Sequence, residues 1–262
     1  ADVIRQRSDR INLWHIQPRT NQTNRVSILE LKDGLFRQDV PVNIWVQTLP
    51  PESQLKKMPV FDVNEDLLVF LKFYDPRRNS IHYCGHHSIR LRCPISSILP
   101  ILWERAGLPH NTRLLLFEER KPLSVERIQN LEQPIEECVQ EVMDGNILVF
   151  QQDISTMELA ALAGTVGSSI KPTAVEYFRD VYYRVDILFV EKNKNNEDEG
   201  FILNLSLKAT YWAIATAVAH YLNTEPEKLQ FFRSQAALNY KETPGAAIRC
   251  NFENSLRDLL LP

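Results

Sequence analysis

The chain repeats one short pattern three times, and an internal repeat constrains a fold more than any single motif does. Charged residues followed by a short apolar strand occur in DRINLW (9–14), TRLLLF (112–117) and EKLQFF (227–232). The aromatic residues that end these segments, Trp14, Phe117 and Phe232, stand 103 and 115 residues apart. In a chain of 262 residues, this spacing predicts three copies of one unit of roughly 100 residues.

The middle copy contains every element of the repeat. An apolar strand at 66–76 precedes a polar return strand at 77–93 and an amphipathic helix at 95–107. The TRLLLF strand, an acidic segment and a closing strand, GNILVFQ (145–151), follow. This order, β-β-α-β with a last strand returning to the sheet, is that of the β-grasp fold of ubiquitin. The predicted fold class is α+β, with tandem ubiquitin-like β-grasp domains.

The outer copies are incomplete. The first starts at the end of a helix, in ADVIRQRS (1–8), and includes VNIWVQ (42–47), which matches the closing strand GNILVFQ. The third has two strands around a charged loop at 193–200, then a helix, but no closing strand before Pro262. We therefore expect a piece of a longer protein. Its predicted parts are a partial domain at 1–55, a complete domain at 60–153, a small and polar-rich linker at 154–172, and a domain at 173–262 that lacks its closing strand.

An acidic stripe is the most unusual feature of the middle copy. Apolar residues from Ile135 to Met143 recur at helical spacing, which predicts a helix that ends near Gly145. Glu137, Glu141 and Asp144 would then share one side of this helix, with the last two at its C-terminus, where the helix dipole favours cations. Residues 118–146 hold eight acids against three basic residues, whereas the rest of the chain is slightly positive. A solvated face and a cation-binding surface both fit this pattern.

No other segment predicts chemistry. On a regular strand His82, Cys84 and His86 would face one side, and Tyr83 and His87 the other, without the ligand spacing of a zinc site. The four cysteines show no disulfide-framework spacing, and the chain has no glycine-rich phosphate loop. We expect no metal, no cofactor and no catalytic residue.

The charge and hydropathy of the chain limit its partners. A net charge of −3 gives nucleic acid no basic surface, so no nucleic-acid partner is expected. No apolar run reaches the roughly 18 residues of a membrane span, and no leader precedes the first copy. Neither a membrane partner nor secretion is expected.

Eight segments, in order, resemble one known family. They are LLVFLKFYDP, IHYCGH, LLLFEERKP, ERIQ, EVMDGNILVFQ, EYFRDVYYRVDILF, LQFFRSQ and NFENSLRDLL. They are similar to the C-terminal ubiquitin-like region of the herpesvirus-associated ubiquitin-specific protease family, from about Ile11 to Leu261. The resemblance implies the first three ubiquitin-like domains of a cysteine-type deubiquitinase (a thiol protease found in the nucleus and also the cytoplasm), without the catalytic domain.

The resemblance also implies a function for the acidic segment. In this family the second ubiquitin-like domain binds lysine-rich segments of partners: GMP synthetase, a maintenance DNA methyltransferase and its ubiquitin-ligase partner, and a viral ubiquitin ligase. Glu141 and Asp144 match acids of the family's binding motif, and Met143 lies between them. Glu118 and Glu126 match acids of a neighbouring pocket. Gln140 and Asn146 stand where the family commonly has aspartates, which weakens the expected affinity for lysine.

Three other functions compete with partner docking. The domains could act only as a spacer that positions a catalytic domain and an activating C-terminal tail. An enzyme in its own right would need a nucleophile and a base that the sequence does not supply. A conjugated ubiquitin-like modifier would end in Gly-Gly, whereas this chain ends in LLLP.

Overall fold

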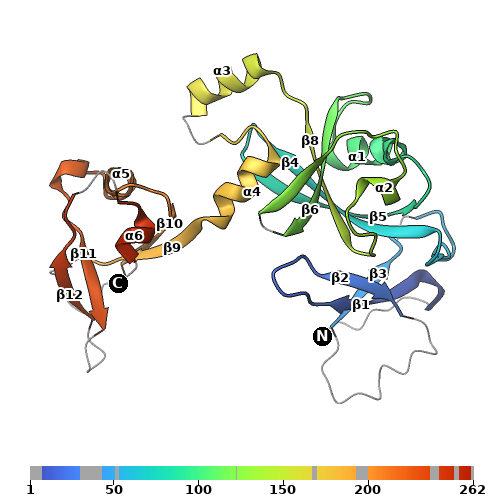
Figure 1. Cartoon of the computed structure of the whole chain (residues 1–262), viewed down its shortest axis with the longest axis horizontal. Coiled ribbons are helices and arrows are strands. Elements are labelled where there is room, and N and C mark those ends of the chain that lie inside the picture. Colours follow the sequence, from blue (N-terminus) through green and yellow to red (C-terminus); the bar gives the residue numbers. More distant parts are fainter. Residues whose placement is uncertain are drawn as a thin grey trace. The chain divides into compact units, whose positions relative to one another are not determined.

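The structure is a computed structural model that describes residues 8–29, 43–50, 53–121, 123–166, 170–192, 200–236, 242–250 and 254–260. Figure 1 shows its helices and strands. The chain divides into two compact units, Ala1–Phe178 and Arg179–Pro262. The first unit contains the first and middle copies of the repeat, and the second unit contains the third copy.

The middle copy forms a five-stranded mixed sheet. Its strands are β4 (Asp66–Asp75), β5 (Ser80–Arg90), β6 (Leu114–Lys121), β7 (Ser124–Ile128) and β8 (Asn146–Gln152). They lie in the order β5-β4-β8-β6-β7. β8 pairs parallel with β4 and antiparallel with β6, so the predicted closing strand is confirmed and lies between two hairpins.

One face of this sheet packs against a helix. The 3₁₀ helix η3 (Ile95–Ile98) leads into α1 (Leu99–Ala106), which Gly107 ends in a left-handed conformation. Leu102 of α1 is fully buried against sheet residues that include Leu71 and Phe150. The short helix α2 (Ile135–Cys138) closes the same core through Ile135. The predicted helix at 95–107 is thus confirmed as η3 followed by α1.

The other face of the sheet is covered by two segments. The beginning of α4 (Ala174–Tyr182) packs Ala174 and Tyr177 against Tyr74 and Phe117. The first copy packs Trp14 against Leu68 of β4. Because both faces of the middle sheet are covered, most residues of β8 are buried, and the consecutive residues Leu67, Leu68 and Val69 of β4 are all buried.

The first copy forms a three-stranded sheet. After the 3₁₀ turn η1 (Ser8–Arg10), β1 (Ile11–Gln17) pairs antiparallel with β2 (Arg25–Ile28) and β3 (Ile44–Thr48). The order β2-β1-β3 repeats the order β7-β6-β8 of the middle copy. β3 confirms the closing strand expected in VNIWVQ, whereas the expected helix end at 1–7 lies outside the described residues.

The segment expected to be a linker contains a helix, α3 (Thr156–Val166). Arg77, in the turn after β4, forms an ion pair with Glu158 of α3 and donates to Gln152 of β8. A small and polar composition therefore did not prevent helix formation, since several of these residues, alanine above all, favour helices.

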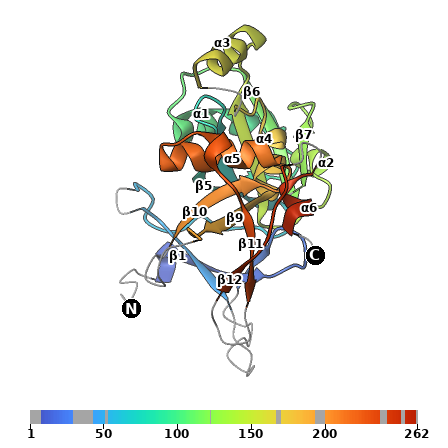
Figure 2. The ribbon, with the colours of Figure 1, turned by 90° about the vertical axis from the view of Figure 1, so that its left-hand side faces the viewer.

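The second unit contains two separate hairpins. β9 (Arg184–Phe189) pairs with β10 (Phe201–Ser206), and β11 (Phe232–Ala236) pairs with β12 (Glu242–Ala247). Helix α5 (Tyr211–Leu222) lies across the β9–β10 hairpin in Figure 2 and packs on it through Ile214 and Val218. The unit also contains the 3₁₀ turn η4 (Pro226–Lys228) and the short helix α6 (Leu256–Leu260).

The third copy has a shorter anchor strand than the sequence predicts. In EKLQFF the apolar part, Leu229 to Phe232, was expected to be a strand, but only Phe232 belongs to β11, while Glu227 and Lys228 lie in the preceding 3₁₀ turn. Within the described residues, no strand of the second unit takes the place that β8 takes in the middle copy. Most of the expected loop, residues 193–199, lies outside the described residues.

Gly145 tests the contact between the first and middle copies. It has a φ of +93°, and a Cβ atom there would lie 3.1 Å from the backbone nitrogen of Val26. We predict that Gly145→Ala lowers the free energy of unfolding by about 3 kcal/mol, from backbone strain and the contact together. Gly107→Ala is the control, since its φ is +63° but nothing lies within 4 Å; it should cost about 1 kcal/mol. Equal losses in urea denaturation would show that the contact with β2 contributes nothing.

Candidate functional site

The acidic segment does not form the long helix that the sequence predicts. α2 ends at Cys138, and Val139 already has extended dihedral angles. Glu141 and Asp144 therefore do not lie at a helix C-terminus, and the expected stripe with Glu137 is wrong. Residues 140–145 instead form an irregular connection to β8, which begins at Asn146.

Side chains replace the helical hydrogen bonds in this connection. The backbone N–H of Gln140 donates to Glu118 Oε2 at 3.0 Å, and that of Met143 donates to Asn146 Oδ1 at 3.1 Å. In a helix these two N–H groups would donate to carbonyl oxygens four residues earlier. Because side chains accept from both N–H groups, these two groups stay paired where the backbone leaves the helix.

Buried Glu118 and Asn146 form hydrogen bonds with the backbone of the acidic segment. Asn146 is fully buried, and its Nδ2 donates to Glu118 Oε1 and to the backbone oxygen of Glu141, both at 3.0 Å. Glu118, on β6, is 4% exposed. Burial raises the pKa of Glu118, while the Gln140 N–H and nearby arginines lower it. Neither residue presents its polar atoms to a large ligand.

Asp144 is half-buried and joins three parts of the chain. Its Oδ1 accepts from the Leu68 N–H at 2.8 Å, and its backbone oxygen accepts from the Val26 N–H at 2.9 Å. Burial raises the pKa of Asp144 to about 6, the Leu68 hydrogen bond opposes this rise, and nearby Asp66 adds to it. A cation placed beside this carboxylate would relieve the cost of keeping it ionised.

Glu141 already binds a cation from the first copy. Both terminal nitrogens of Arg19, in the β1–β2 loop, lie 2.9 Å from Glu141 Oε2. One of them also lies 3.9 Å from the sulfur of Met143. The carboxylate side chain is still 48% exposed. The loop thus places a guanidinium on the carboxylate that the sequence predicts to bind lysine.

Two further arginines neutralise the site. Arg25 is buried, and its pKa is lowered by burial and by Arg19 but raised by Glu141 and Glu118. Arg120, on β6, forms an ion pair with Glu126 of β7 and lies 3.9 Å from Glu118. The site therefore combines four acids with three arginines. It is much less negative than the sequence window alone indicates.

Three other predicted residues of the site lie at or near the surface. Glu126 is largely exposed on β7, and Gln140 is exposed beside Glu141. Met143 is half-buried between Arg19 and Asn146. Sequence reasoning missed Arg19 and Arg25, because no pattern links a loop to an acid 122 residues away. Arg120 was visible only as one of the few bases in the acidic window.

The histidine–cysteine strand differs from the regular alternation that was expected. A bulge in β5, with Gly85 at a φ of +87°, interrupts its pairing with β4. Cys84 packs against the core beneath α1, whereas the His86 ring lies 4.8 Å from the Trp45 ring of the first copy. The expectation that Cys84 and His86 share a side is therefore wrong, because the bulge shifts the phase of the strand.

The same strand has the properties of a structural element. Burial raises the pKa of Cys84, which keeps it a thiol. Burial and the positive charge of Arg105 lower the pKa of His86 and of His87. Both imidazole rings therefore carry less positive charge at a given pH, which leaves less charge for binding anions. Among the described residues, no three His, Cys, Asp or Glu side chains gather where they could hold a metal ion. The expectation of no zinc stays a prediction.

Comparison with known proteins identifies the family of the chain. Residues 11–260 match the family model described as the ICP0-binding domain of Ubiquitin-specific protease 7. The chain belongs to this family. In Drosophila melanogaster, the protein named Ubiquitin carboxyl-terminal hydrolase 7 is 34% identical over 96% of this chain and 21% of its own length.

Other relatives are more distant. Ubiquitin C-terminal hydrolase 12 of Arabidopsis thaliana is 28% identical over 79% of this chain and 17% of its own length. Ubiquitin carboxyl-terminal hydrolase 15 of Schizosaccharomyces pombe is 25% identical over 95% of this chain and 22% of its own length. The chain spans about a fifth of the length of such relatives, and this segment is a non-catalytic domain. In its described part, no helix has both the length and the apolar character needed to cross a membrane.

Asn146 is predicted to stabilise the acidic segment rather than to bind a partner. In Asn146→Asp, a second carboxylate would face buried Glu118 and the donated hydrogen bonds would be lost. We expect a loss of about 3 kcal/mol in the free energy of unfolding at pH 7. Gln140→Asp is the matched control, because Gln140 is exposed and uses only its backbone N–H; it should change stability by less than about 0.5 kcal/mol. Similar effects of the two substitutions would contradict the role of Asn146.

Asp144 is predicted to make stability depend on pH. Its folded pKa of about 6 lies above the ordinary value of 3.8, so the folded state binds the extra proton between these values. The contribution of Asp144 to stability therefore falls as pH rises from about 4 to about 6. Asp144→Asn keeps an oxygen for the Leu68 N–H and should raise the free energy of unfolding by about 1 kcal/mol at pH 7.5, discounted for partial solvation.

The measurement is urea denaturation of both proteins at several pH values. Below pH 4 the difference between them should shrink. A flat difference between the two proteins across this range would mean that burial does not raise this pKa.

Proposed function

We propose that the chain is a partner-docking region that binds lysine-rich segments around Glu141 and Asp144. The observation that carries this proposal is the ion pair between Arg19 and Glu141. It supports a site that accepts a cationic side chain at this carboxylate. A lysine from a partner would take the place of Arg19, while Asp144 and exposed Glu126 would meet further ammonium groups.

The proposal includes the domain assignment. Residues 60–153 would be a complete ubiquitin-like β-grasp domain, residues 1–55 a partial one, and residues 173–262 one without a closing strand. The strand order β5-β4-β8-β6-β7 supports the first assignment. The three-stranded sheet β2-β1-β3 and the hairpins β10-β9 and β11-β12 repeat parts of that order and support the other two domain assignments.

The parent protein is part of the same proposal. The names of the relatives support a ubiquitinyl hydrolase. Its cysteine type, its herpesvirus association and its location in the nucleus and the cytoplasm are proposed from the resemblance alone. The proposed partners are lysine-rich segments such as those of GMP synthetase, the maintenance DNA methyltransferase with its ubiquitin ligase, and a viral ubiquitin ligase. The name of the matching family supports protein binding in general.

A spacer is the second candidate, and a specific observation favours it. The N–H of Thr23 donates to the backbone oxygen of Arg120 at 2.8 Å, and that of Val26 to Asp144 at 2.9 Å. With the Arg19–Glu141 ion pair, these bonds join the first and middle copies firmly. A stiff pair of domains suits a rod that only positions other parts of the protein.

Arg19 provides the test that separates the two candidates. In calorimetry against a synthetic peptide with three lysines, the chain should bind at low salt and lose affinity at physiological salt. Arg19→Gln should bind roughly fivefold tighter, because the peptide no longer displaces an ion pair worth about 1 kcal/mol. Glu141→Lys should lose binding.

A matched control keeps the test specific. Glu227→Lys changes the net charge equally at an exposed position of the second unit and should bind like the unmodified chain. If neither the unmodified chain nor any of its variants binds the peptide at low salt, the docking proposal is wrong and the spacer function is favoured. If Arg19→Gln binds no tighter than the unmodified chain, Arg19 does not compete with the ligand.

A further inference from the structure

The middle copy carries a basic segment that the proposed lysine site does not use. Residues 76–113 contain six arginines and four histidines but one acid, Glu104. This segment includes β5 and α1, at the opposite edge of the sheet from β7 and Glu126. Among the described residues, Arg77, Arg78, Arg90 and Arg113 of this segment pair with acids outside it, whereas no ion pair is found for Arg92 or Arg105.

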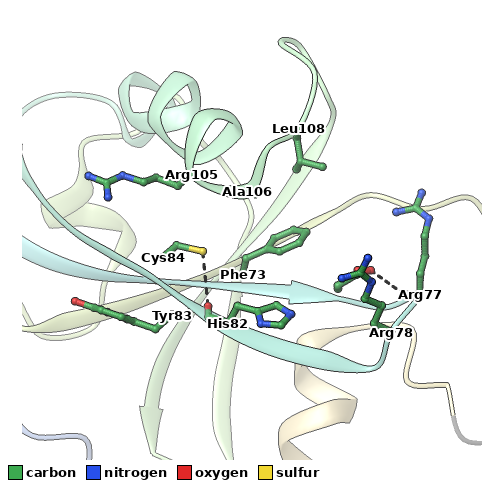
Figure 3. A pocket seen from close by; sticks show the side chains of 10 residues that line it. Phe73, Arg77, Arg78, His82, Tyr83, Cys84, Arg105, Ala106 and Leu108 are labelled. Carbon is green, nitrogen blue, oxygen red and sulfur yellow. Dashed lines mark hydrogen bonds and ion pairs between the residues drawn. The ribbon is translucent and has the colours of Figure 1, made fainter. Parts of the chain in front are cut away.

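A pocket of about 400 Å³ lies at this edge of the sheet, between β5 and α1. Figure 3 shows Phe73 and Cys84 in its middle, with Arg105 at one end and Arg77 and Arg78 at the other. Ala106 and Leu108 add to its apolar part, whereas Asp75, His82 and Tyr83 add polar groups, so the open lining is more polar than apolar. Its volume lies within the roughly 300 to 1,000 Å³ of ligand pockets.

The cations at the two ends of the pocket are not equivalent. Arg77 is paired with Glu158, and the Arg78 side chain lies 3.7 Å from Asp75. Arg105 is exposed and forms no ion pair with any acid in the part of the chain that the structure describes. A Cβ atom at Gly85 would lie 3.1 Å from an Arg105 terminal nitrogen, so the guanidinium lies against the bulge of β5.

β5 is also an edge strand. Within the described residues it pairs with β4 and with no other strand. Before the bulge, residues 80–83 pair regularly with β4, and His82, Tyr83 and Cys84 line the pocket. A free edge offers backbone donors and acceptors to an added strand, and a pocket beside it offers room for a side chain of that strand.

We propose that residues 80–84 and this pocket bind an extended peptide segment of a partner, with apolar residues in its centre and acidic residues beside them. The peptide would add to β5 as a sixth strand and place one apolar side chain between Phe73 and Ala106. Its carboxylates would meet Arg105. Because Arg77 and Arg78 are paired with acids, Arg105 is the charge on the rim that selects an acidic partner, and this site is independent of the lysine site and takes ligands of the opposite charge.

The test uses the whole chain and a synthetic peptide, Val-Ile-Val-Leu with three glutamates on each side. Titration with a fluorescent form of this peptide should saturate, and NMR amide shifts should move along residues 80–84. Arg105→Glu should weaken binding at least tenfold, whereas Arg92→Glu, an exposed arginine of the same basic segment outside the pocket, should change it less than twofold. Ala106→Met, which fills the pocket with a good helix former, should also weaken binding.

Two control peptides separate strand addition from simple charge attraction. A peptide with proline in place of the central isoleucine keeps the charge but lacks an N–H group, and it should not bind. A peptide with lysines in place of the glutamates should not bind at this edge. The proposal is overturned if the proline peptide binds equally well, if Arg105→Glu and Arg92→Glu act alike, or if the amides that shift lie at residues 140–146.

Discussion

The hydrogen bonds that buried Asn146 and Glu118 make to each other and to the backbone of residues 140–143 determine the path of the acidic segment. The bonds to the backbone take up polar groups that a longer α2 would have satisfied within itself, so the chain leaves the helix at Cys138. From there Asp144 reaches Leu68 on one side and Val26 on the other. The proposed docking surface therefore depends on a small polar core, and the acids at the surface occupy positions set from beneath it.

This arrangement mixes structural and binding roles in neighbouring residues. Glu118 and Asn146 stabilise the connection, whereas Glu141 keeps much of its surface open while it holds Arg19. Three arginines offset most of the acidic charge, and two of them come from the first copy. The affinity for a cationic partner then depends on the difference in free energy between the ion pair that the partner forms with Glu141 and the Arg19–Glu141 ion pair that it replaces. Such a site favours partners that present several cations together over a single lysine.

Much of the fold could be predicted from the sequence because the repeat specifies it. The anchor strands β1 and β6, the closing strands β3 and β8, and the helix at 95–107 follow from apolar periodicity and from comparison of the copies. The length of α2 could not, because its end depends on Glu118, which is distant in sequence from Gln140. The phase of β5 could not either, since one residue of bulge at Gly85 moves His86 to the other face. The candidate acids were found, but Arg19 and Arg25 were not, because no local pattern links either residue to acids about a hundred residues further along the chain.

The ion pair across the two copies has a practical consequence for work with shorter fragments. A polypeptide that starts after residue 55 would keep β4 to β8 and every acid of the site, but it would lack Arg19, Arg25 and the Val26 amide. Its surface around Glu141 and Asp144 would carry more negative charge than the same surface in the longer chain. Dissociation constants obtained with such a fragment would therefore describe a different electrostatic surface and would overstate how tightly the longer chain holds a lysine-rich partner.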